Sequence, residues 1–351
     1  MLKSLRKDLV LILAVLAVFM SLSYAIGFVT DRSPKMVELQ TAFLSGERAP
    51  KAQPTTVRVW RKPAFEKKAV LNSTSLKNPE KMQANNNGNI FVLDWSDLRV
   101  KEFSPDGKLL RMFGEEVGSP EAFVNPTDFA MDSGGNLWVC DLKQKRIGVF
   151  NTDGSKKTIK PQNTTYRLAA IGDVMFTMVT PSHSRLFETY DLSGRQLKSF
   201  GELIDDPYNK GIILDGDIVA DPENHGIFYG GRYLGIIGAY DVEGNQRFLV
   251  QTIDNVPPPK VLGIEGKQKI KPDTTPAILS LSALDNELYV LSGAHRDGTG
   301  GKVMDVYDKR DGHYLYSWEL PAVGEEAIVG SNYIYIRHYN EVTVWRFTSH
   351  T

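Results

Sequence analysis

The sequence predicts an all-β protein, a six-bladed β-propeller of four-stranded blades, with an N-terminal transmembrane helix. Three observations support this prediction. The stretch "GNIFVLDWSDLRVKEFSPDG" starts at Gly88 and returns 47 residues later, at Gly135, as "GNLWVCDLKQKRIGVFNTDG". An aromatic residue in a strand-like segment then recurs four more times along the chain. Finally, an uncharged run of 21 residues lies near the amino terminus.

The uncharged run over residues 9–29 has about the length that a helix needs to cross a bilayer. Residues 1–8 carry Lys3, Arg6 and Lys7, a positive flank that is expected to stay in the cytoplasm. This predicts a single-pass protein of the inner (cytoplasmic) membrane, with its bulk in the periplasm or extracytoplasmic space. The alternative is a signal peptide cleaved after "SYA" at Ala25. The apolar run continues past that site, which favours the anchor.

Small residues recur every four positions within this span, at Ala17, Ser21 and Ala25. Such a stripe lets a second membrane helix approach closely, so these residues are candidates for helix packing. The alternative is that small residues are simply common in membrane helices.

Residues 30–56 are predicted to form a linker. Its first part, "DRSPKMVELQTAFLSG", favours one short helix that Ser33 could cap. Met36, Leu39 and Phe43 would then share one side and are candidate partner contacts. The following "ERAPKAQPTT" is polar and proline-containing, as is typical of an extended spacer.

Composition excludes several functions. With 41 basic against 42 acidic residues, the chain lacks the basic surface that a general nucleic-acid binder needs. Its one cysteine, Cys140, cannot form an intrachain disulfide, and its apolar surroundings "LWVC" predict a buried structural thiol. The sequence contains no G-x-S-x-G, H-E-x-x-H, P-loop or C-x-x-C motif. Binding is therefore favoured over catalysis, and no cofactor is predicted.

The repeats define the predicted propeller domain, residues 57–348. Each repeat contains short apolar strands separated by turns rich in Gly, Asn or Asp. Spacings of 38 to 67 residues between the aligned aromatics, with four strands per repeat, are typical of propeller blades. The aligned aromatics are Phe103, Phe150, Tyr190, Tyr240, Tyr307 and Trp345.

The last repeat lacks a fourth strand, because the sequence ends at Thr351. Residues 57–71, "VRVWRKPAFEKKAVL", precede the first full repeat and contain spare strand-like sequence. We expect this segment to supply the missing outer strand, which would close the ring and remove an exposed sheet edge.

Over residues 78–155 the two best repeats resemble the NHL repeat of six-bladed propellers. The matching positions in the two repeats are Gly88, Asn89, Asp94, Arg99 and Phe103, and then Gly135, Asn136, Asp141, Arg146 and Phe150. In this pattern, the Asp is expected to accept hydrogen bonds from the turn and from the following Arg. The resemblance implies a six-bladed propeller. It also implies relatives that are lactonases or similar hydrolases, which hold one divalent metal at the axis with Glu, Asn and Asp.

Five oxygen-bearing residues lie near the predicted starts of inner strands: Glu80, Asn125, Asp128, Asp217 and Glu325. Oxygen ligands at such positions suit calcium, so these residues are the metal candidates. The alternative is that they cap turns.

The connection over residues 251–276 is long, and it contains three successive prolines at Pro257, Pro258 and Pro259. Loops of this length are uncommon unless they are functional, and the prolines would stiffen it into an extended arm. These prolines are candidate partner contacts, and tolerated loop variation is the alternative.

The leading hypothesis is a membrane-anchored extracytoplasmic propeller, a protein-binding scaffold or accessory subunit of an integral-membrane complex. The alternative is a metal-dependent hydrolase, lactonase-like enzyme or lyase acting on a small periplasmic substrate. A third reading is a carbohydrate-binding or sensor module, in which Trp95, Trp138 and Tyr233 could stack on sugars. Most of these aromatics are instead expected to pack between blades.

Overall fold

The computed structural model describes residues 37–39, 49–71, 75–179, 185–203, 213–264, 267–294 and 300–349. The predicted membrane span at residues 9–29, with Ala17, Ser21 and Ala25, lies outside these ranges, as do Met36 and Phe43. Within the described ranges, no helix combines the length and apolarity needed to cross a membrane.

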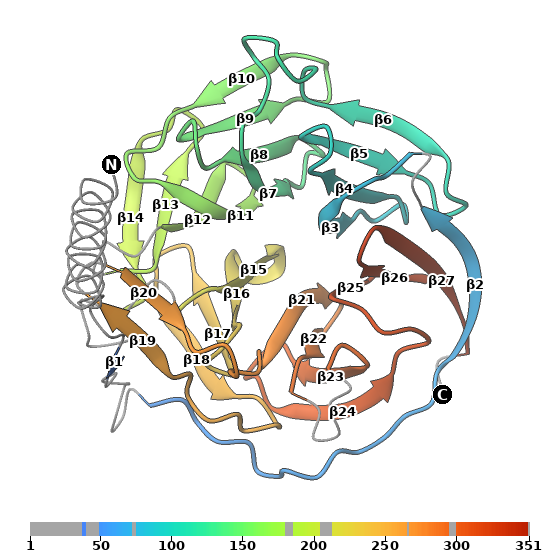
Figure 1. Ribbon diagram of the computed structural model, residues 1–351, viewed down its shortest axis with the longest axis vertical. Helices are drawn as coiled ribbons and strands as arrows, with labels where there is room; N and C mark the ends of the chain where they lie inside the picture. The colour runs from blue at the N-terminus through green and yellow to red at the C-terminus, as the bar shows by residue number, and fades with distance from the viewer. Residues whose placement is uncertain are drawn as a thin grey trace, which may run out of the picture. The chain divides into compact units, whose positions relative to one another are not determined.

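Six four-stranded antiparallel sheets in the described residues surround a central axis, which confirms the predicted six-bladed propeller (Figure 1). The six aligned aromatics each lie in the third strand from the axis of their blade. From the inner to the outer strand, the blades are: blade 1, β3 (Pro79–Ala84), β4 (Ile90–Asp94), β5 (Arg99–Phe103) and β6 (Leu109–Phe113); blade 2, β7 (Pro126–Met131), β8 (Leu137–Asp141), β9 (Arg146–Phe150) and β10 (Lys156–Ile159); blade 3, β11 (Thr165–Ile171), β12 (Val174–Val179), β13 (Phe187–Asp191) and β14 (Gln196–Phe200); blade 4, β15 (Gly216–Asp221), β16 (Gly226–Gly231), β17 (Ile236–Asp241) and β18 (Gln246–Gln251); blade 5, β21 (Ile278–Leu284), β22 (Glu287–Ser292), β23 (Val303–Asp308) and β24 (Tyr314–Glu319); blade 6, β25 (Glu326–Val329), β26 (Tyr333–His338), β27 (Glu341–Ser349) and β2 (Ala64–Leu71).

The ring closes as the sequence predicts. Strand β2 supplies the outer strand of blade 6 and pairs antiparallel with β27, from Phe65 opposite Phe347 to Leu71 opposite Val342. Leu71 is buried between blades 6 and 1, in an apolar cluster that includes Phe103 and Val344. Sequence-distant ends of the chain are therefore joined in one sheet, which leaves no unpaired strand at the closure.

The predicted linker ends earlier than residue 56. Residues 49–63, here called the belt, run along the outer strands of blades 4 and 5 (Figure 1). Lys51 forms a parallel bridge with Val250 of β18, and Trp60 forms one with Ser317 of β24. The segment is extended, as expected, but it belongs to the propeller because the outer strands offer unpaired backbone groups.

The core lies between neighbouring blades, where the faces of adjacent sheets pack together. Between blades 4 and 5, for example, buried Phe228 and Ile237 pack in one cluster with Leu281 and Tyr307. Cys140 is fully buried in blade 2, as predicted, and burial raises the pKa of its thiol to about 12. It is a structural thiol.

The Asp of the repeat motif fixes the start of its own blade. Asp94 accepts hydrogen bonds from the backbone N–H groups of Lys77 and Asn78 at 3.0 Å and from Ser96 at 2.9 Å. Its cationic partner is Lys101 at 2.6 Å. The expected bond from Arg99 is wrong in this repeat, because the Arg99 guanidinium lies 3.4 Å from Asp97.

The corresponding Asp in blade 2, Asp141, accepts hydrogen bonds from the turn, as predicted. Asp141 accepts from the backbone N–H groups of Val124, Asn125 and Gln144. The Nε of Arg146 is 4.0 Å away, and this side chain donates instead to the carbonyls of Glu121 and Ala122.

A separate compact unit contains strands β1 (Val37–Leu39) and β19 (Val261–Ile264). Together with β20 (Lys267–Ile270) they form a sheet of order β1-β19-β20, with β1 antiparallel to β19. The helix predicted for the linker is therefore wrong at Val37–Leu39. Pairing with a strand from the long 251–276 connection overrides the weak local helix signals. The three prolines at 257–259 precede β19, with Lys260 between them and the strand.

Candidate functional site

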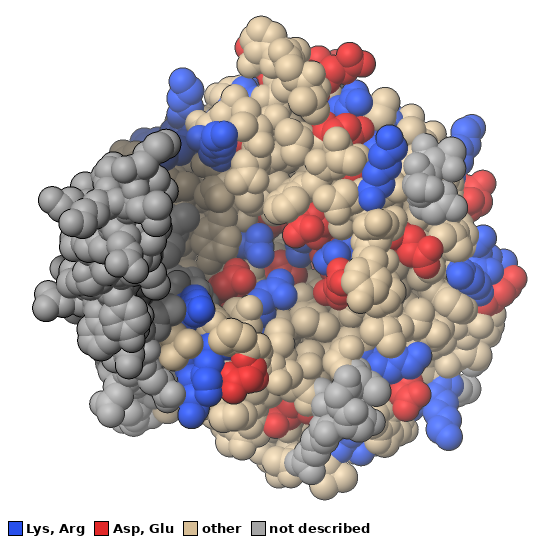
Figure 2. Space-filling model, viewed as in Figure 1, with Lys and Arg blue, Asp and Glu red and all other residues tan. Residues whose placement is uncertain are grey.

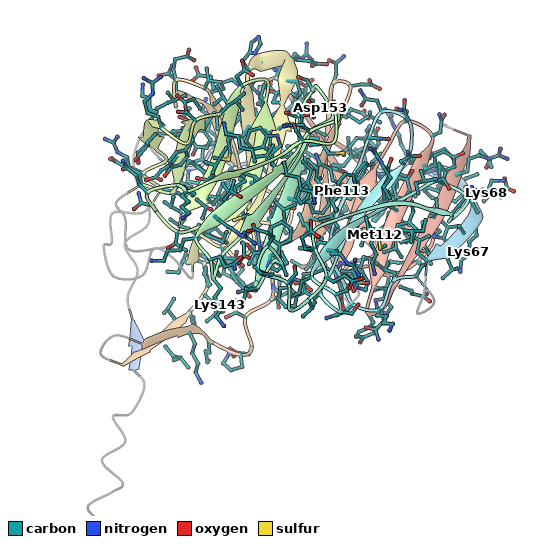
Figure 3. All side chains as sticks on the ribbon, turned by 90° about the horizontal axis from the view of Figure 1, so that it is seen from above. Lys67, Lys68, Met112, Phe113, Lys143 and Asp153 are labelled. Carbon is teal, nitrogen blue, oxygen red and sulfur yellow. The ribbon has the colours of Figure 1, made fainter. Side chains whose placement is uncertain are left out.

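The propeller has two faces, defined here by the chain segments they carry. The loop face carries the connections between blades, where each inner strand begins, and the turns between second and third strands. Backbone bonds hold these parts together, from Trp95 N to Asn78 O and from Leu142 N to Asn125 O. The turn face carries the remaining hairpin turns. Lys143 and Asp153 mark the loop face and the turn face, on opposite sides of the ring (Figure 3).

Charged side chains gather around the central hollow of the loop face (Figure 2). These charged side chains are here called the axial ring. At its centre, the Lys81 ammonium from blade 1 lies 2.7 Å from Asp217 of blade 4 and 3.1 Å from Glu326 of blade 6. Burial alone would lower the pKa of Lys81, but these carboxylates outweigh it and raise the pKa above its ordinary value. Burial alone would raise the pKa of Asp217, but the positive charges of Lys81 and Arg167 lower it below its ordinary value. Both groups are therefore ionised.

Three arginines complete the ring. Arg167 lies 3.7 Å from Asp215, which also lies 3.3 Å from Arg232. Arg337 lies 2.8 Å from Glu325 and 3.3 Å from Glu326. Each cation of the axial ring therefore has a carboxylate of the chain itself as its partner.

Polar side chains also connect each inner strand to the next around the axis. The inner edge of each blade has backbone groups without a strand partner, and a buried group of that kind needs another partner. The six junctions are: Met131 N to Gln83 Oε1 at 3.1 Å, Leu168 N to Asp128 Oδ2 at 3.0 Å, Arg167 Nε to Gly216 O at 3.0 Å, Leu281 N to Asp217 Oδ2 at 3.4 Å, Ala327 N to Ser280 Oγ at 3.0 Å, and the Lys81–Glu326 ion pair.

Asp128 is a buried carboxyl of this ring. It is 1% exposed and accepts hydrogen bonds from the backbone of Phe129 and Leu168. Burial raises its pKa to about 6, against the opposing effect of Lys81 and Arg167. Burial likewise raises the pKa of Glu80.

Four of the five predicted metal candidates lie at the channel: Glu80, Asp128, Asp217 and Glu325. Asn125 lies in the connection that precedes β7, where its backbone N–H donates to Asp141 and its carbonyl accepts from Leu142.

The cations of the ring were not predicted from the sequence: Lys81, Arg167, Arg232 and Arg337. Lys81 and Arg167 carry a detectable signal, because each is a charged residue within a predicted inner strand, at nearly the position that Asp128 holds in blade 2. Across the described ranges, no three His, Cys, Asp or Glu side chains are grouped so as to hold a metal ion. Between Asp217 and Glu326, the Lys81 ammonium supplies the positive charge instead.

From this ring toward the turn face, the channel widens into a cavity of about 1160 Å³. Lys81 and Asp128 belong to its wall, and polar residues of the turn-face hairpins, such as Asn86 and Asp173, also line it. Small apolar residues from all six blades contribute as well: Ala84, Ala130, Ala170, Val219, Ala283 and Val329. A space of this size could hold a small organic molecule.

The aromatic candidates for sugar stacking fall in different environments. Trp138 is 2% exposed, its indole donates to Asp132, and it packs among apolar residues between blades 2 and 3, as expected for most of these aromatics. Its strand is an inner part of blade 2, where both faces are covered. Trp95 is 39% exposed on the loop face, and its indole donates to the carbonyl of Pro126 at 2.8 Å. Tyr233 is half-buried in the turn after β16.

Comparisons with known proteins bear on the fold. No family model matches the chain, and no curated protein matches it. Among solved structures, a member of the DUF4221 family from Bacteroides vulgatus is similar, with a TM-score of 0.55 and 10% identity over 83% of this chain and 98% of that one. A virginiamycin B lyase from Staphylococcus aureus has a TM-score of 0.52 and 11% identity, over 81% and 100%. The WD40 repeats of RRP9 have a TM-score of 0.51 and 14% identity, over 82% and 99%. These similarities support the propeller fold.

Proposed function

We propose that this protein is a membrane-anchored extracytoplasmic propeller of the inner membrane that works by binding another protein, as an accessory subunit of an integral-membrane complex. The observation that carries the proposal is the axial ring, in which every cation is paired with a carboxylate of the chain itself. Groups held in this way join the blades and are not available to act on a substrate. A closed, internally connected ring is suited to presenting a rigid surface.

The belt supports the anchoring part of this proposal. It follows the predicted membrane segment, and Arg58 fixes it to blade 5 through Asp305 at 2.9 Å and to Asp254 at 2.6 Å. Gln53 adds bonds to the carbonyls of Gln251 and Gly312. The segment that leads from residues 1–48 is thus firmly attached to the propeller.

The test compares the full chain with a chain that lacks residues 1–48, a cut that spares the belt. We expect the full chain to sediment with membranes, resist salt washing and co-purify with a stoichiometric membrane protein in mild detergent. The shortened chain should fold, remain in the soluble fraction and lose that partner. A full chain that is released by salt, or that purifies alone, would contradict the proposal.

Two observations favour a second candidate, an enzyme or binding protein for a small periplasmic substrate. The channel contains a cavity of about 1160 Å³, and Asp128 on its wall has a pKa raised to about 6, within the range of general acids and bases. Similarly folded virginiamycin B lyase shows that such propellers include lyases. This candidate, in its metal-dependent form, requires a tightly bound divalent ion in purified protein. Elemental analysis that detects less than one tenth of an equivalent would remove it.

The finer assignment to NHL-type repeats is also a proposal, and it rests on residues 78–155. Asp94 and Asp141 support it, because both accept bonds from the two backbone N–H groups that lead into their own inner strands. If the two repeats are equivalent, D94A and D141A should destabilise the protein to a similar extent, by about 1–3 kcal/mol. Clearly different losses in denaturant unfolding would contradict the assignment.

A further inference from the structure

Large apolar side chains are exposed more densely in residues 57–70 than elsewhere on the propeller. Val57 is 72% exposed, Val59 57%, Trp60 46% and Val70 37%. The described ranges contain twelve such side chains, so this stretch of 14 residues holds a third of them. It comprises the last part of the belt and most of β2, along the outer edge of blades 5 and 6 (Figure 1), and is here called the rim strip. Scattered exposed apolar residues are ordinary, but a contiguous group indicates a contact surface.

Contacts with blade 5 fix the direction of these side chains. The Arg58 guanidinium points inward, 2.9 Å from Asp305, so its charge is not part of the exposed surface. Neighbours in an extended segment point to opposite sides, so Val57 and Val59 point to solvent. Val59 N donates to the hydroxyl of Tyr314 at 2.9 Å, and backbone bonds to β24 hold the residues beside it. The apolar groups are therefore presented on a segment that is fixed to the ring.

The exposed charges of the rim strip and of the neighbouring strands β24 and β27 are mostly positive, with every ion pair included in the balance. Glu66 is shared by Lys68 at 2.7 Å and Arg346 at 2.5 Å. The hairpin that touches Ala69, residues 104–108, adds one charge of each sign. Five exposed cations otherwise stand against three exposed carboxylates: Arg61, Lys62, Lys67, Lys68 and Arg346 against Glu66, Glu319 and Glu341.

Three of these cations have no carboxylate partner in the part of the chain that the structure describes. The Arg61 guanidinium lies 3.6 Å from the ring centre of Tyr316, and the Lys67 ammonium lies 5.6 Å from the ring centre of Trp345. Lys62 is exposed and makes neither kind of contact. An aromatic ring attracts a cation but leaves its charge unneutralised. Figure 3 shows Lys67 at the outer edge of the ring, where an anion can reach it.

This combination of residues is typical of a membrane–water interface. Tryptophan is enriched at the depth of the lipid headgroups, and lysine and arginine beside it are attracted to anionic lipids. The proposed anchor brings the strip to such a surface, because only residues 30–48 separate the predicted span from the belt. These 19 residues extend to at most about 65 Å, so the tether keeps the strip at a high effective concentration beside the bilayer.

We propose that the rim strip lies against the membrane surface, with Val57, Val59 and Trp60 among the lipid headgroups and Lys62 and Lys67 beside anionic phosphates. The ring then stands with its edge at blades 5 and 6 on the bilayer. Its loop face and its turn face both stay open to a protein partner. This inference rests on the anchoring part of the proposed function and deepens it by naming the surface and the lipid chemistry.

The first experiment measures how deep the strip lies, with the full chain in nanodiscs of phosphatidylglycerol and phosphatidylcholine. A nitroxide spin label is attached at Val57→Cys, while Cys140 is fully buried and does not react. Electron paramagnetic resonance records collisions of the label with oxygen, which concentrates in lipid, and with a water-soluble nickel chelate. The matched control is a label at Leu197→Cys, 47% exposed on β14 at the opposite side of the ring (Figure 1). We expect nickel collisions at position 57 to be at least about threefold fewer than at position 197, and oxygen collisions to be more frequent.

Charge variants test the electrostatic part of the inference. Lys62→Glu/Lys67→Glu, combined with the label at position 57, should raise nickel collisions at least about twofold, because the strip then repels anionic lipids. Nanodiscs of phosphatidylcholine alone should have a similar effect. The matched control, Lys143→Glu/Lys145→Glu on the loop face, changes the net charge equally and should leave the collisions unchanged. Circular dichroism establishes that the variants are folded.

Three results would overturn the inference. The first is an equal frequency of nickel collisions at positions 57 and 197. The second is a collision frequency at position 57 that neither Lys62→Glu/Lys67→Glu nor removal of the anionic lipid changes. The third is a label at position 57 that is immobilised and shielded from both oxygen and nickel, which would assign the strip to a protein contact instead.

Failure of this inference is distinguishable from failure of the proposed function. If the chain enters nanodiscs and co-purifies with a membrane partner while position 57 stays in water, the lipid contact is wrong and the proposed function stands. If the unchanged chain does not enter nanodiscs, or yields no partner, the proposed function itself fails.

Discussion

Among single residues, Arg58 has a role that its place at the start of the predicted propeller domain did not suggest. Its guanidinium is 13% exposed and bonds to Asp305, which is 1% exposed, and to Asp254. Removing the cation leaves a buried carboxylate without its charged partner. We expect Arg58→Ala to lower the free energy of unfolding by about 2–3 kcal/mol in denaturant titration.

The matched control for this prediction is Arg185→Ala. Arg185 pairs with Glu202 at 3.3 Å, but both side chains are about half exposed. Its removal should cost less than about 1 kcal/mol. Equal losses for the two variants would show that the belt is not held by Arg58.

The raised pKa of Asp128 leads us to expect that the stability of the protein depends on pH. Its folded pKa of about 6 lies above the value of about 3.9 expected for an unfolded chain, because burial disfavours its charged form. Between these two values the folded state binds more protons than the unfolded state, so this group's contribution to stability falls as the pH rises from 4 to 6.

The variant Asp128→Asn removes this titration and keeps an oxygen to accept from Leu168. Relative to the variant, the unchanged protein should lose about 2–3 kcal/mol between pH 4 and pH 7. Denaturant unfolding of both proteins at several pH values measures the difference. A constant difference across this range would show that Asp128 does not titrate there.

Residue environments were predicted where they depend on neighbouring sequence. The burial of Cys140 follows from the apolar strand around it, and the turn bonds of Asp94 follow from its place at the end of β4. The partner of Lys81 could not be predicted in this way, because Asp217 lies 136 residues away in the sequence. Only the closed ring brings the two together.

Among the elements, β2 determines whether the ring is closed. Leu71 on this strand is 1% exposed, whereas its neighbour Val70 is 37% exposed, since successive residues of a strand face opposite sides. If β2 closes blade 6, Leu71→Ala should lower the free energy of unfolding by about 2–4 kcal/mol. Val70→Ala should have a much smaller effect. Comparable midpoints for the two variants in denaturant would contradict the closure.

The blade strands were predictable because each repeat carries its own alternating pattern and turn residues. The outer position of β2 followed from counting strands in the last repeat. The belt and β1 were not predictable, because both pair with strands that are distant in sequence. Weak local signals at Val37–Leu39 favoured a helix, and pairing with β19 determined the actual structure.

For the whole molecule, the axial ring connects stability to function. Four acidic residues predicted to lie near the starts of inner strands do lie at the channel: Glu80, Asp128, Asp217 and Glu325. Their cationic partners could not be predicted, because the radial arrangement of the blades determines which inner strands face each other. In the described residues, each cation of the ring is paired with a carboxylate of the chain itself.

We propose above all that this propeller works bound to another protein. Native mass spectrometry of the full chain, purified from membranes in mild detergent, tests it most directly. We expect a discrete complex heavier than the 39.2 kDa chain, containing an integral-membrane protein in fixed ratio and the chain with residues 1–48 intact. A species at or below the mass of the single chain, with no partner under any gentle condition, would contradict it.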